Sequence, residues 1–152
     1  MRRYAWHLGC LAVLMLCGCA KEGPEYASDL VPVRGTVTLD GQPLADATVM
    51  FLAKQGESRQ TFAMTDSSGQ FALATGAGLE GALPGEYDVL ITKFVMPDGS
   101  PAPPDVAPMD VGAVEALPPQ YSSPSSMTLT ATIPESGGDV AFDLLSKPAR
   151  KR

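Results

Sequence analysis

The sequence contains one histidine, one tryptophan and three cysteines, and all of them lie at or before Cys19. The rest of the chain therefore has no histidine for a Ser-His-Asp or Cys-His catalytic group, and it lacks the usual zinc ligands. It has no pair of cysteines for a disulfide, so apolar packing must stabilise the fold. No motif places a serine beside Lys54 or Lys93. We expect no enzyme activity, no catalytic residues, no metal site and no cofactor.

Basic residues are also scarce, with 11 Lys and Arg against 17 Asp and Glu. Four of these basic residues fall in the last six positions, at Lys147, Arg150, Lys151 and Arg152. The chain that precedes them is markedly acidic. Because binding to nucleic-acid phosphates needs clustered Lys and Arg, we expect no nucleic-acid partner.

Long hydrophobic runs are absent as well. The apolar run from Leu8 to Leu16 has about 9 residues, whereas a helix that spans a membrane needs about 20. Arg2 and Arg3 precede this run and small residues follow it, which is the pattern of a secretory signal. The two arginines could also indicate twin-arginine export, but any signal begins with basic residues.

The run Leu16-Cys17-Gly18-Cys19 resembles a bacterial lipobox. This resemblance implies that residues 1–18 form a lipoprotein signal peptide, that cleavage occurs before Cys19, and that Cys19 carries the lipid. The alternative is an ordinary signal with a chance cysteine near its end. Ala20 comes next, and by resemblance to known sorting rules a residue other than Asp there favours the outer membrane. We expect a protein anchored by lipid to the membrane of the cell envelope, on the periplasmic or surface face of the outer membrane.

Composition divides the remaining chain into a tether, one domain and a tail. Removal of 18 residues from 152 leaves 134, which suits a single domain with its own core. Residues 19–30, which begin with the lipidated cysteine, have little apolar content and predict a flexible tether. Residues 31–146 form the domain, and residues 147–152 form a basic tail.

Alternating apolar and polar residues predict about seven short strands and no long amphipathic helix. Residues 33–39 show this period of two, and Asp40-Gly41 then supplies a turn with positive φ. A second turn is predicted where Asp66 caps its own backbone and Gly69 is left-handed. The strand at 61–65 places Phe62 and Met64 on one face. The other strands are expected at 48–52, 71–74, 86–93, 127–133 and 140–144. The fold class is therefore all-β, an antiparallel β-sandwich.

A proline-rich loop at about 96–126 interrupts the strands. Because proline fixes φ and lacks an N–H, a regular helix or inner strand is not expected there. A loop this long is usually functional or disordered. Tyr121, with Leu117 and the flanking prolines, is a candidate partner contact, but we favour the alternative, in which Tyr121 pins the loop onto the sandwich. Acids of the loop could gather around a divalent ion, but we favour solvated charges: Asp98, Asp105, Asp110 and Glu115.

Several motifs resemble, in order, those of small lipoproteins of planctomycete-type bacteria that carry a carboxypeptidase-regulatory-like (transthyretin-like) domain. They are Val33-Arg34-Gly35-Thr36-Val37-Thr38-Leu39-Asp40-Gly41-Gln42-Pro43-Leu44, Ala47-Thr48-Val49-Met50-Phe51, Thr65-Asp66-Ser67-Ser68-Gly69-Gln70-Phe71, Pro84-Gly85-Glu86-Tyr87-Asp88-Val89 and Leu117-Pro118-Pro119-Gln120-Tyr121. The resemblance covers residues 31–146 and implies a transthyretin-like, or prealbumin-like, sandwich. The family name refers to an accessory domain beside a peptidase, so it implies no peptidase activity.

These observations lead us to expect a non-enzymatic, lipid-anchored envelope protein that binds or supports a partner. The partner would be another envelope protein, a peptide or a glycan, and an edge strand could accept an extended segment of it. The alternative is a carbohydrate-binding accessory domain at the cell surface. Such domains usually display exposed aromatic platforms, and most aromatic residues after Cys19 fall on expected core positions.

Overall fold

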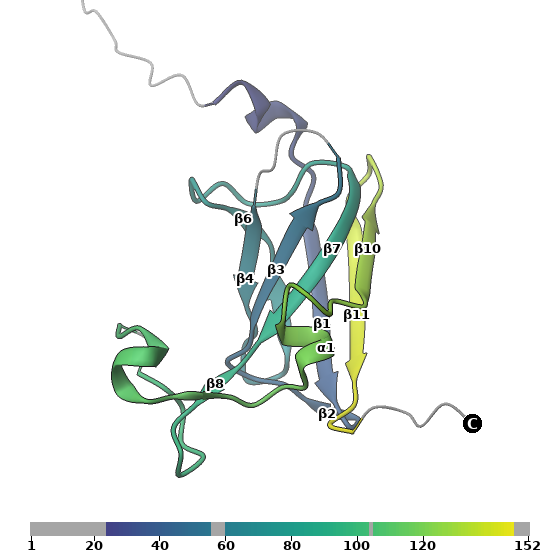
Figure 1. The fold of residues 1–152 in the computed structure, drawn as a ribbon. Helices are drawn as coiled ribbons and strands as arrows, with labels where there is room; N and C mark the ends of the chain where they lie inside the picture. Colours follow the sequence, from purple (N-terminus) through teal and green to yellow (C-terminus); the bar gives the residue numbers. More distant parts are fainter. Residues whose placement is uncertain (1–23, 56–59, 104, 148–152) are drawn as a thin grey trace, which may run out of the picture.

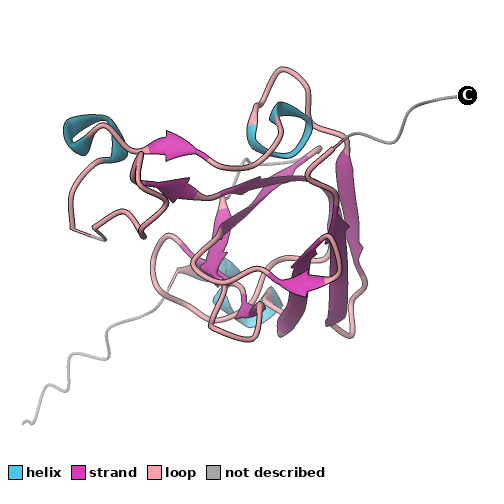
Figure 2. Cartoon of the chain, turned by 90° about the horizontal axis from the view of Figure 1, so that it is seen from below, coloured by secondary structure: helices cyan, strands magenta, loops and turns pink. Residues whose placement is uncertain are grey.

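The computed structural model describes residues 24–55, 60–103 and 105–147. The predicted signal peptide, Cys19 and most of the predicted basic tail lie outside these residues. Within them the protein is mostly β, and two main sheets pack face to face as a sandwich-like domain (Figures 1 and 2). The described residues contain no helix with the length and hydropathy of a membrane span.

The first sheet is built around its central strand β1, which has neighbours on both sides. Its strands are β1 (Val33–Leu39), β2 (Gln42–Pro43), β5 (Gln70–Ala72) and β11 (Gly138–Leu144). β2 and β5 pair with β1 antiparallel, but β11 pairs with β1 parallel, from Val33 opposite Gly138 to Leu39 opposite Leu144. The expectation of a wholly antiparallel sandwich was therefore wrong in this pair. The strand that precedes β11 in the sequence, β10, belongs to the other sheet. No hairpin therefore joins β11 to β1, and β11 is free to pair in the parallel direction.

The second sheet is antiparallel throughout, in the order β10-β7-β3-β4-β6. Its strands are β3 (Thr48–Ala53), β4 (Thr61–Met64), β6 (Ala74–Thr75), β7 (Gly85–Thr92) and β10 (Leu129–Ile133). β3 lies at the centre, as its continuous apolar sequence predicted. Seven of the described strands correspond to the predicted ones. The others are two-residue strands: β2, β6, β8 (Phe94–Val95) and β9 (Val114–Glu115).

Aromatic side chains join the inner faces of the two sheets. The ring of Phe51 on β3 packs against Tyr87 of the same sheet, with 5.6 Å between ring centroids, and against Phe142 of the other sheet at 6.1 Å. Phe71 on β5 stacks on Phe142 at 6.4 Å. Edge and tilted contacts of this kind add to the stabilisation that burial of the rings already supplies.

Gly35 on β1 makes room for this aromatic cluster. A Cβ atom at Gly35 would lie 2.5 Å from Cζ of Phe71 and 2.5 Å from the carbonyl oxygen of Val140. Any larger residue would push the Phe71 ring away or separate β1 from β11. The close approach of backbone and ring explains why a strand in the middle of a sheet carries glycine, the residue that packs least.

The turns on either side of this region confirm the sequence prediction. Asp40 and Gly41 have positive φ angles of 50° and 79° and join β1 to β2. In the second turn Oδ1 of Asp66 accepts hydrogen bonds from the backbone N–H groups of Ser68 at 2.8 Å and Gln70 at 2.9 Å. Gly69 has the predicted left-handed conformation, with φ 74°.

Part of the segment predicted as a tether, residues 24–30, lies among the described residues. Glu25–Asp29 form a 3-10 helix, η1, in which the N–H of Ala27 donates to the carbonyl oxygen of Pro24 at 2.8 Å. Beyond it Val31 forms an antiparallel bridge with Ala82, just before β7. The chain is thus fastened to the sandwich at Val31, directly after the predicted tether.

Strand β4 exposes its two large apolar side chains, Phe62 and Met64, to solvent. Phe62 and Met64 share a face, as predicted, but they are 46% and 62% exposed. Thr61, Ala63 and Thr65 point into the core instead. The hydroxyl oxygen of Thr65 accepts the N–H of Ala47 at 2.9 Å, whereas the buried hydroxyl of Thr61 has no hydrogen-bond partner among the described residues.

Thr61 and Thr65 allow a matched test of this packing, since both are 2% exposed. Thr61→Val removes a buried hydroxyl without a partner, and we expect the free energy of unfolding to rise by about 1 kcal/mol. Thr65→Val leaves the N–H of Ala47 without its acceptor and should lower it by about 1–3 kcal/mol. Urea denaturation measures both values. Equal destabilisation by the two changes would contradict the assignment.

Candidate functional site

The most prominent surface feature is an arm at one end of the sandwich, which we define as residues 94–103 and 105–117 (Figure 1, lower left). β8 and β9 pair antiparallel at its base, and the 3-10 helix η2 (Pro108–Val111) lies between them. A one-turn helix, α1 (Pro119–Ser122), follows the arm. The prediction that no regular helix forms here was therefore wrong for this single turn. Pro119 is its first residue, where the missing N–H is harmless.

Glu115 fastens the base of the arm. Its Oε1 accepts the backbone N–H groups of Lys93 and Leu117, each at 2.9 Å, and the N–H of Ala116 donates to the carbonyl oxygen of Lys93 at 2.8 Å. Its Oε2 is buried and has no hydrogen-bond partner among the described residues. The sequence interpretation of Glu115 as a solvated loop charge was wrong, because this carboxylate bridges the two chain segments on which the arm stands.

Leu117 and Tyr121, the candidate partner contact, lie in the hydrophobic core. The hydroxyl oxygen of Tyr121 accepts the backbone N–H of Leu145 at 3.3 Å, just after β11. Both side chains are buried, so they offer no exposed contact surface. Their position agrees with the alternative interpretation, in which Tyr121 holds the proline-rich segment onto the sandwich.

The arm carries several exposed apolar side chains. Met109 on η2 is 92% exposed, and Phe94, Val106 and Val114 are also exposed. Single exposed apolar residues are common on protein surfaces. Four exposed apolar side chains in one projecting segment are less common, and they indicate a contact surface. The proline content of the segment was visible in the sequence, but the outward direction of these side chains was not.

The arm and the chain entry lie at opposite ends of the sandwich (Figure 1). Val31, where the entering chain is fastened, bridges Ala82 shortly before the start of β7. β8 follows the other end of β7. Eight residues of β7 therefore separate the two features, a length of about 26 Å at about 3.3 Å per residue.

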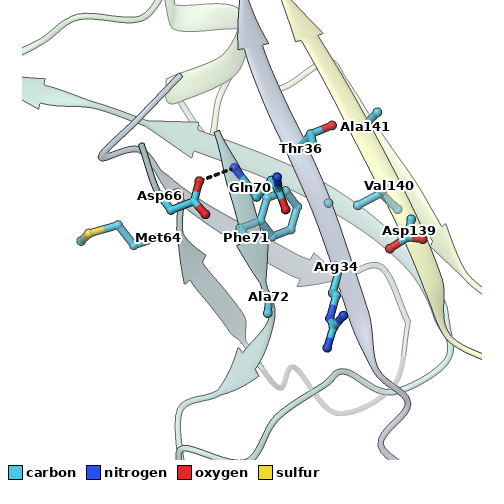
Figure 3. Close-up of a pocket in the computed structure, with 11 residues that line it drawn as sticks. Arg34, Thr36, Met64, Asp66, Gln70, Phe71, Ala72, Asp139, Val140 and Ala141 are labelled. Atoms are coloured by element: carbon cyan, nitrogen blue, oxygen red, sulfur yellow. Dashed lines mark hydrogen bonds between the residues drawn. The ribbon is translucent and has the colours of Figure 1, made fainter. Parts of the chain in front are cut away.

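A second feature is a groove of about 740 Å³ on the outer face of β11, β1 and β5 (Figure 3). Thr36 and Gln70 lie along its floor, and Met64 lies at one side. Arg34 on β1 is opposite Asp139 on β11 in the sheet register, and Arg34 forms no ion pair within the described part of the chain. The groove is mixed in character, with polar and charged side chains around small apolar ones.

Two acids near these features, Asp66 and Asp98, belong to turns. The Ser68 hydroxyl and the Gln70 N–H hydrogen bond to Asp66 at the rim of the groove and hold its pKa below the ordinary value. In the arm, the Ser100 hydroxyl and N–H lower the pKa of Asp98 in the same way. Over residues 24–55, 60–103 and 105–147, no three acidic, histidine or cysteine side chains are grouped so as to hold a metal ion.

The comparisons with known proteins do not identify a family for this chain. No protein-family model matches the chain, and no curated protein does. One solved structure with a partial likeness is a 9R-lipoxygenase from Cyanothece, with 13% sequence identity and a TM-score of 0.32. The match covers 78% of this chain but only 16% of the lipoxygenase. A likeness this weak says nothing about function.

Glu115 gives a test of how the arm is held. In Glu115→Ala the N–H groups of Lys93 and Leu117 lose their acceptor, and we expect their hydrogen exchange to accelerate by about 10- to 100-fold. Amides of β3 should be unaffected. Asp110→Ala, which removes an exposed acid of the same arm, is the control. Unchanged exchange at both amides in Glu115→Ala would show that other contacts hold the arm.

Proposed function

We propose that this protein is a non-enzymatic lipoprotein of the cell envelope that binds another envelope protein through its arm. The observation that carries this proposal is the position of the arm, rooted by Glu115 and projecting from the end opposite the chain entry. The lipid anchor at Cys19 and membership of the small lipoproteins with a transthyretin-like domain are parts of the proposal, and they rest on the sequence motifs.

The anchor and the arm together would fix the orientation of the protein relative to the membrane. Pro24, the first described residue, follows Cys19 closely in the sequence, so a lipid on Cys19 would tie the entry end of the sandwich to the membrane. The length of β7 would then separate the membrane from the base of the arm. The arm would face away from the membrane that holds the protein, where a partner in the same compartment can reach it.

The side chains of the arm indicate the partner's surface. Met109 is unbranched and adapts to irregular pockets, and exposed acids flank it at Asp105 and Asp110. A complementary site would be an apolar pocket with Lys or Arg at its rim. The acidity of the arm argues against insertion into an anionic lipid surface.

A carbohydrate-binding accessory domain is the second candidate. The groove supports it, because its volume is within the range of small-ligand sites and its lining is partly polar. The aromatic residues speak against it. Phe62 and Phe94 are exposed but do not line the groove, and Phe71, which does, is buried. A glycan array whose hits disappear in Arg34→Ala and persist in Met109→Ala would favour this alternative.

The anchor can be tested separately. We expect Cys19→Ser to remove the lipid attachment site and to shift the protein from the membrane pellet to the soluble fraction, since the lipid is the proposed anchor. Cell fractionation and immunoblotting measure this shift. Pelleting of the variant with membranes at the wild-type level would refute lipid anchoring.

The role of the arm can be tested in living cells with a photo-crosslinking amino acid in place of Met109. We expect one discrete adduct with another protein, because a specific pocket would cover this side chain. The same amino acid at Glu80, which is exposed near the entry end, is the control and should give no such adduct. The same adducts from both positions would indicate random collision and would count against the arm as a binding surface.

A further inference from the structure

Strand β11 has an open edge. Among the described residues it pairs with β1 alone. The N–H of Gly138 donates to Pro32 at 3.0 Å, and the carbonyl oxygen of Leu144 accepts the N–H of Asp40 at 2.9 Å. The even-numbered residues of β11 therefore direct their backbone groups toward β1. By the alternation of a strand, the backbone groups of Asp139, Ala141 and Asp143 face the open side.

The same three residues project their side chains onto the outer face of the sheet, where all are exposed. Phe142 and Leu144, which alternate with them, are in the core. Asp143 accepts the hydroxyl of Thr38 at 2.7 Å, while Asp139 has no ion pair within the described chain. Asp139 and Ala141 also line the groove of Figure 3, so the open edge and the groove form one surface.

The carboxylates of Asp139 and Asp143 disfavour pairing of β11 with the β11 strand of a second copy of this chain. If two β11 strands paired antiparallel about Ala141, Asp139 of each would stand opposite Asp143 of the other. Like charges in directly opposed positions destabilise a strand pair, and charged edges are a common protection against self-association. The described residues add to this repulsion, since their acids far outnumber the basic residues, which are Arg34, Lys54, Lys93 and Lys147.

The same arrangement attracts a partner of opposite charge. We propose that the edge of β11 binds an extended segment of another protein that carries Lys or Arg at two positions four residues apart. Side chains at such positions lie on one face of a strand and would stand opposite Asp139 and Asp143. Backbone hydrogen bonds from Asp139, Ala141 and Asp143 supply affinity, and the charges set the register. This site uses neither the arm nor the lipid anchor, so each proposal can fail without the other.

The test uses the full-length chain in detergent and a fluorescent peptide of sequence Thr-Lys-Val-Thr-Val-Lys-Thr. We expect saturable binding in fluorescence anisotropy that weakens with added salt. A peptide with Glu in place of both Lys should bind at least about tenfold more weakly, because attraction at two positions becomes repulsion. Equal binding of the two peptides, or no binding of the Lys peptide at low salt, would overturn the proposal.

Variants of the protein distinguish specific binding at the β11 edge from non-specific attraction of the basic peptide to an acidic protein. The pair Asp139→Asn and Asp143→Asn keeps the side-chain shape and should weaken binding about tenfold. The control pair Asp105→Asn and Asp110→Asn removes the same charge from the arm and should leave binding unchanged. Equal weakening by the two pairs would show non-specific attraction and overturn the site.

Ala141→Pro tests the backbone contribution. It removes an N–H from the open edge and leaves the hydrogen bonds to β1 in place, so proline should be tolerated there. We expect the variant to keep the wild-type circular dichroism spectrum and to lose peptide binding. Unchanged peptide binding by the folded variant would overturn the proposal that the peptide pairs with the open edge of β11. If the variant does not fold, the two Asn pairs decide the question.

Discussion

The ring of Phe51 lies between the two sheets, in contact with Tyr87 on its own sheet and Phe142 on the other. No disulfide is available to the domain after Cys19, so this packing and the apolar residues around it must hold the sheets together. Phe71 extends the contact by stacking on Phe142, which requires that Gly35 stay without a side chain. The position of β11, and with it the open edge and the floor of the groove, depends on these rings.

Short-range features of the fold were predictable because neighbouring residues determine them. The alternation in β1 and the turns at Asp40 and Asp66 needed only local backbone preferences, and the structure confirms them. The face of β4 was not predictable. Its period of two was clear, but the choice between Phe62 and Thr61 for the core depends on how β4 pairs with β3. The parallel direction of β11 likewise depends on its path from the other sheet.

The candidate sites show why a residue type alone is a weak guide to its role. Asp66 and Asp98 cap their own turns, which a nearby Ser and Gly in the sequence can suggest. Glu115 holds the arm through Lys93, a residue 22 positions away, and only the closed loop reveals this contact. Tyr121 similarly meets Leu145 across 24 positions. Asp139 and Asp143 become a pair at an edge only once the neighbours of β11 are known.

The parallel pairing of β1 and β11 has a mechanical consequence. The chain enters β1 at Val33 and leaves β11 at Leu144, and these residues lie at opposite ends of the paired strands. A force that pulls the two ends of the domain apart would slide β1 along β11 rather than peel them apart. The seven register pairs from Val33–Gly138 to Leu39–Leu144 would share the load at the same time. The domain is therefore built to resist tension along its length.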